Sequence, residues 1–157
     1  MWIGVISNTE GYVSPEVSSA LHGVDYIVHC GAIGSWEVIE ELSKIARVTG
    51  VVGPNDDAAV IPFERVLAKT FGGAKVYIVH RLGDPRDLPQ GVKRDLQKAD
   101  PRIVLFAGNA PFNDRIDGRL FFCPGAAGRK RPRSGRSVGM VEIDGQSVRA
   151  ELIPLKE

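Results

Sequence analysis

Side chains that could do chemistry gather in three short loops and at one further strand end. The loops read Asn8-Thr9-Glu10-Gly11, Gly53-Pro54-Asn55-Asp56 and Gly108-Asn109-Ala110-Pro111, and the strand end is His80-Arg81. Each follows a short apolar run that is typical of a buried strand. Because α/β proteins place their sites where a buried strand ends in a polar loop before a helix, the loop after 2–6 is where we expect a site.

A strongly basic segment runs from Gly128 to Arg136 and holds five cations in nine residues. One interpretation is a solvated surface loop. The other is a contact for an anion, because guanidinium groups match the oxygens of phosphate. Binding to nucleic acid is not expected, because no aromatic residues alternate with the cations. The formal net charge of +1 gives no further argument for nucleic acid or a membrane surface.

Hydrophobic periodicity predicts the elements that hold these loops. In the first third of the chain, strands at 2–6, 26–30 and 47–52 alternate with helices that begin at Pro15 and run from Ser35 to Ile45. This order predicts a parallel sheet with crossover helices. Further on we expect a hairpin of 63–71 and 75–80, a helix at 92–99, and strands at 103–107, 120–123, 137–143 and 147–155. The predicted fold is α/β (α+β), a four-layer αββα sandwich of two mixed β-sheets.

Length and composition bound the kind of protein. The 157 residues suit one domain, 1–157, and 43% apolar and 25% charged residues are ordinary for a globular chain. No apolar run is long enough to cross a bilayer and no signal peptide is recognised, so a cytoplasmic protein is expected. Cys30 and Cys123 stand alone, which predicts two buried thiols rather than a disulfide or a zinc site.

A framework of residues along the whole chain resembles one known family. It includes Ile3-Gly-Val-Ile-Ser7, the stretch from Ala20 to His29, Gly31, Ile33-Gly-Ser35, Glu41-Leu42, Gly53, Val79-His80, Ala99-Asp100, Gly108, Pro124-Gly125, Pro132-Arg133 and Ser137-Val138. In this order they are similar to the small single-domain calcineurin-like phosphoesterases. That bacterial and archaeal phosphodiesterase branch also includes the small scaffold subunit of retromer. The resemblance implies the calcineurin-like phosphoesterase fold and a site for two divalent metals.

The metal ligands that the resemblance implies are largely replaced in the first half of the chain. The family motif Asp-x-His-Gly corresponds to Asn8-Thr9-Glu10-Gly11, and the aspartate that bridges the two metals corresponds to Ala32. In the motif Gly-Asn-x-Asp, the asparagine falls on Pro54, with Asn55 one position away, and Asp56 is kept. Loss of the bridging carboxylate removes the group that holds two cations together against their repulsion.

The second half shows the same loss. The next histidine is kept as His80, but Arg81 follows it where the family usually has glycine. The motif Gly-His-x-His becomes Gly108-Asn109-Ala110-Pro111, without either histidine. We therefore predict a pseudo-phosphoesterase with no confident catalytic residue and no cofactor. Its remnant site comprises Asn8, Glu10, Asn55, Asp56, His80 and Asn109.

Two forms of binding remain open for such a protein. It could be a scaffold that binds a protein partner or associates with itself, as the retromer relative suggests by analogy. Alternatively, the cleft could bind an anionic small molecule through Arg81, Arg129, Arg131 and Arg133. The rival hypothesis is an active phosphodiesterase or phosphatase with one noncanonical divalent cation, such as manganese or magnesium. Its ligands would be Glu10 and His80 together with either Asn55 or Asp56. Glu10 and His80 are thus the candidate metal ligands common to the two possible sets.

Overall fold

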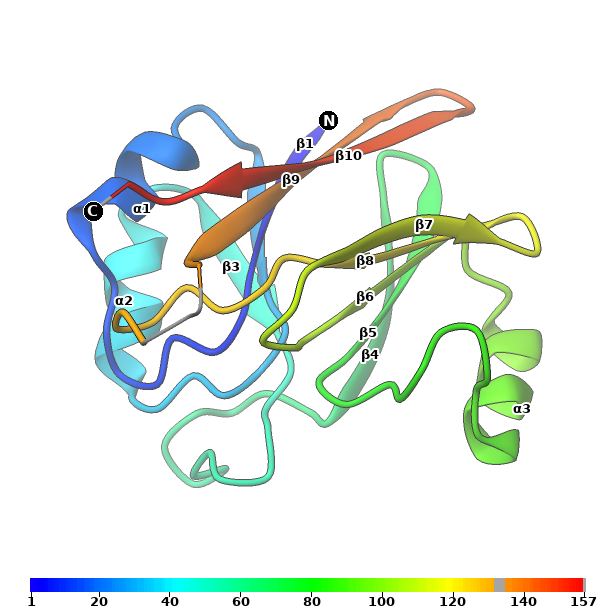
Figure 1. Cartoon of the computed structure of the whole chain (residues 1–157), viewed down its shortest axis with the longest axis horizontal. Coiled ribbons are helices and arrows are strands. Elements are labelled where there is room, and N and C mark those ends of the chain that lie inside the picture. The colour runs from blue at the N-terminus through cyan, green and yellow to red at the C-terminus, as the bar shows by residue number, and fades with distance from the viewer. Residues whose placement is uncertain (132–134, 157) are drawn as a thin grey trace.

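Two five-stranded mixed sheets form the centre of the molecule in the computed structural model, which describes residues 1–131 and 135–156 (Figure 1). The first sheet has the order β10-β9-β1-β2-β3 and the second β4-β5-β6-β8-β7. The elements are β1 (Trp2–Ile6), α1 (Pro15–Ala20), β2 (Tyr26–His29), α2 (Trp36–Ser43), β3 (Arg47–Gly50), β4 (Val66–Phe71), β5 (Ala74–Val79), α3 (Gln90–Ala99), β6 (Ile103–Phe106), β7 (Phe112–Ile116), β8 (Arg119–Cys123), β9 (Ser137–Asp144) and β10 (Ser147–Pro154).

The main core lies between the two sheets. Successive side chains of a strand point to opposite faces, so alternate residues of both sheets meet there. Ile3 and Val5 of β1 face Ile78 of β5 and Phe122 of β8 across this layer, and all four are essentially inaccessible to solvent. Cys30 is a buried free thiol of the same core, and Cys123 is one in the outer cluster of the second sheet, as predicted. Burial raises the pKa of both thiols, which keeps them protonated.

Helices cover the outer face of each sheet. Val17 of α1 and Leu42 of α2 pack with Ile27 on the first sheet, and Leu96 of α3 packs with Phe121 on the second. Figure 1 shows α1 and α2 on one side of the molecule and α3 on the other. The four-layer sandwich of two mixed sheets is therefore confirmed. No helix in the described part of the chain is long and apolar enough to cross a membrane.

The structure corrects some predicted elements. Strand β7 was not predicted, because its central residues are exposed and Asn113 and Asp114 disfavour strands. β3 ends at Gly50 rather than Val52, because Val51 makes only an isolated bridge to Glu64. The hairpin strand β4 begins at Val66 instead of residue 63, α2 ends at Ser43 instead of Ile45, and α3 begins two residues early, at Gln90.

The parallel strands bring the polar loops together. β1, β2 and β3 run parallel in the first sheet, and β5, β6 and β8 run parallel in the second. Their carboxyl ends carry Asn8, Gly31, His80 and Asn109 into the same region of the molecule. The fold thus places every predicted loop at one edge of the two sheets.

Candidate functional site

A cleft of about 540 Å³ opens at these strand ends. Its lining contains all six residues of the predicted remnant site, namely Asn8, Glu10, Asn55, Asp56, His80 and Asn109. Arg81 and Arg131 also line it, together with apolar groups of Leu82 and Phe106. Arg129 is not among the lining residues, and Arg133 lies outside the described residues. The structure therefore gathers most of the predicted site residues in one cleft.

The loop after β1 is held against the loop after β2 by backbone hydrogen bonds. The amide of Asn8 donates to the carbonyl of Gly31 at 3.0 Å, and that of Glu10 donates to Ala32 at 2.9 Å. Asn8, Glu10 and Ala32 all have positive φ, at 54°, 49° and 57°. Glutamate and alanine rarely adopt this left-handed conformation, which costs about 1–2 kcal/mol per residue. Such strain is typical of functional loops and persists here because the neighbouring backbone fixes it.

A buried histidine links the same two loops. The amide of Gly31 donates to Nδ1 of His29 at 3.0 Å, so this nitrogen carries no proton. Nε2 then donates to the hydroxyl of Thr9 at 2.9 Å, and Thr9 donates to the carbonyl of Ile33 at 2.9 Å. Burial lowers the pKa of His29 to about 3, which keeps the ring neutral. His29 is thus a structural residue that joins the two loops.

Asp56 is fully engaged by backbone donors. One carboxylate oxygen accepts from the amides of Ile33 at 3.1 Å and Gly53 at 2.8 Å, and the other accepts from Gly34 at 2.9 Å. The bonds from Ile33 and Gly34 tie the loop after β3 to the loop after β2, and the bond from Gly53 closes the turn that carries Asp56. Because a carboxylate that already accepts three N–H groups has little capacity left for a cation, Asp56 is a loop-fixing residue in this structure.

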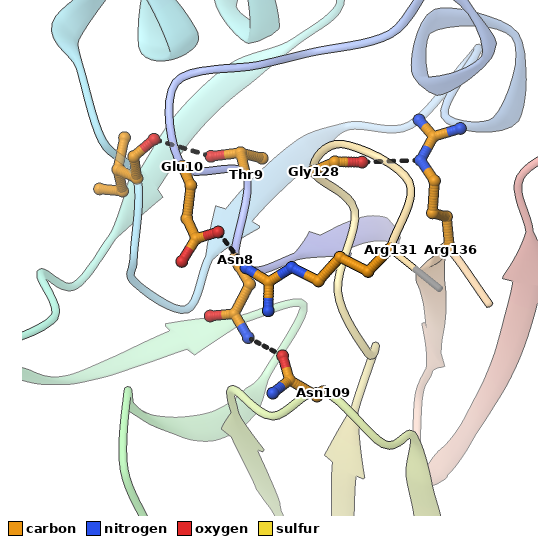
Figure 2. A network of polar contacts seen from close by, with 8 residues as sticks. Asn8, Thr9, Glu10, Asn109, Gly128, Arg131 and Arg136 are labelled. Carbon is orange, nitrogen blue, oxygen red and sulfur yellow. Dashed lines mark hydrogen bonds and ion pairs between the residues drawn. The ribbon is translucent and has the colours of Figure 1, made fainter. Parts of the chain in front are cut away.

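Glu10 and Arg131 form an ion pair across the cleft. Figure 2 shows the Arg131 side chain reaching toward Glu10, with Asn8 directed to Asn109. The Asn8 side-chain amide donates to Oδ1 of Asn109 at 3.3 Å, which joins a loop of the first sheet to one of the second. Asn8 and Asn109, at positions where the family has an aspartate and a histidine, thus contact each other through their side-chain amides. Glu10, at a third ligand position, is paired with Arg131.

His80 is fixed from behind. Its Nδ1 lies 2.9 Å from the carbonyl of Cys30, which can only accept, so Nδ1 is the protonated nitrogen. Gly31 makes this approach possible, because a Cβ there would lie 2.6 Å from Nδ1. A Cβ on Gly53 would lie 3.2 Å from Nε2. His80 keeps a lone pair on Nε2, as a metal ligand would need, but lacks acidic neighbours that are free to share a cation.

The basic segment is anchored to the β1 loop. The amides of Ala127 and Gly128 donate to the carbonyls of Ser7 at 3.0 Å and Asn8 at 3.1 Å. The chains are so close that a Cβ on Gly128 would lie 2.7 Å from the Asn8 carbonyl oxygen. Arg136 is buried and donates to the Gly128 carbonyl at 2.7 Å. Gly128 and Arg136, the first and last residues of the segment, are therefore held by hydrogen bonds and do not belong to a solvated loop.

Arg129 and Arg131, two of the three arginines that the structure describes in this segment, make different contacts. Arg129 lies over the ring of Tyr12, with 4.5 Å between guanidinium carbon and ring centroid, so it supports the loop rather than the cleft. Arg131 lines the cleft and meets Glu10. The supporting roles of Thr9 and Arg136 were missed from sequence. The only sequence signal for these roles was position: Thr9 lies inside the motif Asn8-Thr9-Glu10-Gly11, and Arg136 ends the basic segment.

The donor atoms of the cleft do not fit a pair of divalent metals. In the described ranges 1–131 and 135–156, no group of three or more His, Cys, Asp and Glu side chains is placed to hold a metal ion. The lining carries the carboxylates of Glu10 and Asp56 against the guanidinium groups of Arg81 and Arg131, so its formal charge is balanced without any metal. Ala32, at the bridging position, offers no side-chain donor.

Comparison with known proteins places this chain among phosphoesterases. The sequence model of the calcineurin-like phosphoesterase superfamily domain matches residues 1–146. A protein of Methanocaldococcus jannaschii named as a probable metallophosphoesterase is 29% identical over 168 residues, covering 100% of this chain and 83% of its own length. One of Methanothermobacter thermautotrophicus with the same name is 29% identical over 160 residues, covering 98% and 92%.

Solved structures show the same fold at lower identity. Zinc-complexed Vps29 from Entamoeba histolytica aligns with a TM-score of 0.75 at 16% identity, covering 98% of this chain and 99% of its own. An archaeal phosphodiesterase aligns with a TM-score of 0.75 at 17% identity, covering 98% and 100%. The match of the family's sequence model over nearly the whole chain, on this fold, shows that the protein belongs to the calcineurin-like phosphoesterase superfamily.

Proposed function

We propose that this protein is a pseudo-phosphoesterase, a member of the family that binds through its old metal cleft without hydrolysing. The observation that carries the proposal is the Glu10–Arg131 ion pair. It places a guanidinium group against a carboxylate at a position where the family coordinates metal. The positive charge of Arg131 next to this carboxylate would repel a divalent ion that approached the same oxygens.

Electrostatics supports this proposal. Two divalent ions bring four positive charges, which metal sites offset with several carboxylates. The two carboxylates of this cleft are already offset by Arg81 and Arg131, and Asp56 accepts three backbone hydrogen bonds. A pair of metals here would meet net repulsion. Since hydrolysis in this family depends on metal-activated water, no hydrolytic step follows from the residues present.

An anionic ligand is the binding partner that the cleft favours. Arg81 lines it and makes no ion pair with any residue that the structure describes. The Asn109 side chain accepts through its oxygen, which leaves its nitrogen as a further donor. Guanidinium and amide donors around apolar groups suit a small molecule with a phosphate or carboxylate group.

A hydrolysis assay separates this proposal from the rival metalloenzyme. Purified protein is assayed on a chromogenic phosphodiester with added manganese, beside His80→Ala. As a control we choose His22→Ala, because His22 is exposed and does not line the cleft. We expect the three proteins to give the same background rate. Turnover that His80→Ala abolishes and His22→Ala keeps would contradict the proposal.

Protein binding or self-association is a second candidate, supported by Trp36. This side chain is 37% exposed at the first residue of α2, just after Gly34 of the cleft lining. Exposed tryptophans are frequent anchors of protein interfaces. Sedimentation velocity at increasing concentration tests self-association. If Trp36 anchors self-association, the sedimentation coefficient should rise with concentration in the wild type and stay constant in Trp36→Ser. A monomer at all concentrations would remove the self-association form.

A further inference from the structure

We propose that Glu10 acts as a built-in substitute for the ligand, occupying an oxyanion site on Arg131 until an anionic ligand displaces it. This inference rests on the proposed function, since it assumes a cleft that binds without metals. It adds the residue that recognises the anion and the residue that competes with the anion. The cleft is then self-inhibited, and binding is an exchange of one oxyanion for another.

The first support is chemical. A carboxylate and a phosphate present oxygens that a guanidinium binds in the same way, with charge-assisted hydrogen bonds. The chain itself places a carboxylate on the terminal nitrogen of Arg131, so an oxyanion is shown to fit there. Both side chains line the same cleft. The position that Glu10 occupies is therefore one that an oxyanion of a ligand could take.

The second support is the exposure of the pair. The side chains of Arg131 and Glu10 are 46% and 56% exposed. Ion pairs this open to water contribute little net free energy, because both groups are solvated when the pair separates. Exchange of Glu10 for a ligand therefore meets only a small energetic barrier. A deeply buried pair would be a permanent structural link instead.

The third support is that the backbone of Glu10 is fixed independently of the pair, and that the basic segment is held at Gly128, three residues before Arg131. The amides of Glu10 and Gly11 donate to the carbonyls of Ala32 at 2.9 Å and Ile33 at 2.8 Å. On the other side, Gly128 is bound to the Asn8 carbonyl and to the buried Arg136. Glu10 can therefore turn away from Arg131 by rotation of its own side chain while the loop after β1 stays in place.

Arg81 completes the site as a second cation in the cleft lining. With Glu10 turned away, the cleft would present two guanidinium groups and the Asn109 amide to an incoming anion. With Glu10 in place, its carboxylate pairs with Arg131, and its negative charge repels the anion. Removing the charge of Glu10 should thus strengthen anion binding, whereas removing Arg131 should weaken it.

Calorimetric titration of the EDTA-treated protein with inorganic phosphate tests the exchange. Glu10→Gln keeps the size and backbone requirement of Glu10, and we expect it to lower the dissociation constant about fivefold, the range of one exposed charge pair. Arg131→Gln should raise the dissociation constant by a similar factor. In the double variant, Glu10→Gln should give less improvement than it does alone, because its benefit depends on Arg131.

The matched controls are Glu142→Gln and Arg149→Gln, which break an exposed ion pair between β9 and β10 outside the cleft lining. Neither should change phosphate binding. Unchanged or weaker binding in Glu10→Gln, equal effects of Glu10→Gln with and without Arg131, or no binding in any protein would overturn the inference. Absence of binding in every protein would also remove the anionic ligand from the proposed function, whereas the proposed lack of hydrolysis would stand, because the assay with manganese tests it separately.

Discussion

Asp56 shows how a residue kept from the family motif can serve the fold. Its carboxylate collects the amides of Ile33, Gly34 and Gly53, and so fixes two of the loops that form the cleft. Resemblance to the family motif Gly-Asn-x-Asp made Asp56 a candidate ligand, and an aspartate kept there is compatible with both functions. Only the three-dimensional positions of the donors distinguish them.

Replacing Asp56 with asparagine should destabilise the protein. One oxygen becomes an NH2 group that must face either the amide of Gly34 or those of Ile33 and Gly53, and the facing donor loses its acceptor. The expected loss is about 1–3 kcal/mol in the free energy of unfolding. Urea denaturation measures it. The neighbouring Asp57→Asn is the control, since Asp57 accepts from a single amide, that of Ala59, and is exposed. Equal losses in both variants would contradict the role of Asp56.

His29 should make stability depend on pH. Its pKa is about 3 in the folded chain, against an ordinary value of 6.5. Between these values the unfolded chain binds a proton that the folded chain does not, so stability falls as pH falls below 6.5. We expect a loss of about 1.4 kcal/mol between pH 7.5 and 5.5.

Urea denaturation at both pH values checks this expectation. His29→Gln, which can still donate to Thr9, should be less stable but should lack this part of the pH dependence. His22→Gln is the control, because His22 is exposed and should leave the dependence unchanged. If the full dependence persists in His29→Gln, another group is responsible.

At the scale of elements, the strands that the sequence predicts best are those buried on both faces. β1, β2 and β6 are continuous apolar runs, and their approximate position follows from the residues alone. β7 could not be found in this way, because it is an edge strand whose middle three residues are exposed. Its side chains instead meet the other sheet, where the Asn113 amide donates to the Ala150 carbonyl at 3.1 Å. That pairing is set by tertiary structure and leaves no periodic signal.

Glycine positions provide a test of the packing between elements. In Gly139→Ala the added Cβ would lie 2.2 Å from the Phe122 ring between the two sheets, so something must shift. Overpacking of this kind costs about 1–3 kcal/mol. The same change at Gly91, in α3 with no atom near its Cβ, should stabilise by about 0.5–1 kcal/mol. Thermal denaturation should show opposite shifts, and shifts of equal sign would contradict the packing described here.

At the scale of the whole molecule, the fold and the candidate site differ in how much the sequence reveals. The four layers follow from alternating apolar patterns and from residues spread along the chain. The missing ligands at Ala32 and Asn109 are also visible in the sequence. The ion pair is not, because Glu10 and Arg131 are 121 positions apart and meet only after two sheets have packed. Nothing in the pattern of the basic segment separates Arg131 from Arg129, which lies on Tyr12 instead.

Placing the ligands of the family motifs in this chain should give it affinity for metal. The triple variant Asn8→Asp, Glu10→His and Ala32→Asp puts back the two ligands of the first family motif and the bridging carboxylate, and it removes the partner of Arg131. Aspartate tolerates positive φ better than alanine does, so the backbone at position 32 can accept it. We expect manganese to raise the melting temperature of this variant but not that of the wild type. No shift in the variant would mean that other ligands matter more.

The central claim is that this phosphoesterase fold no longer binds a pair of metals. Equilibrium dialysis of the metal-free wild-type protein against manganese tests it most directly, with the bound metal counted per chain. The balanced charge of the cleft and the Glu10–Arg131 pair predict well under one ion per chain at micromolar manganese. Two ions bound per chain, and lost together in His80→Ala, would contradict the claim and would indicate an active metallophosphoesterase.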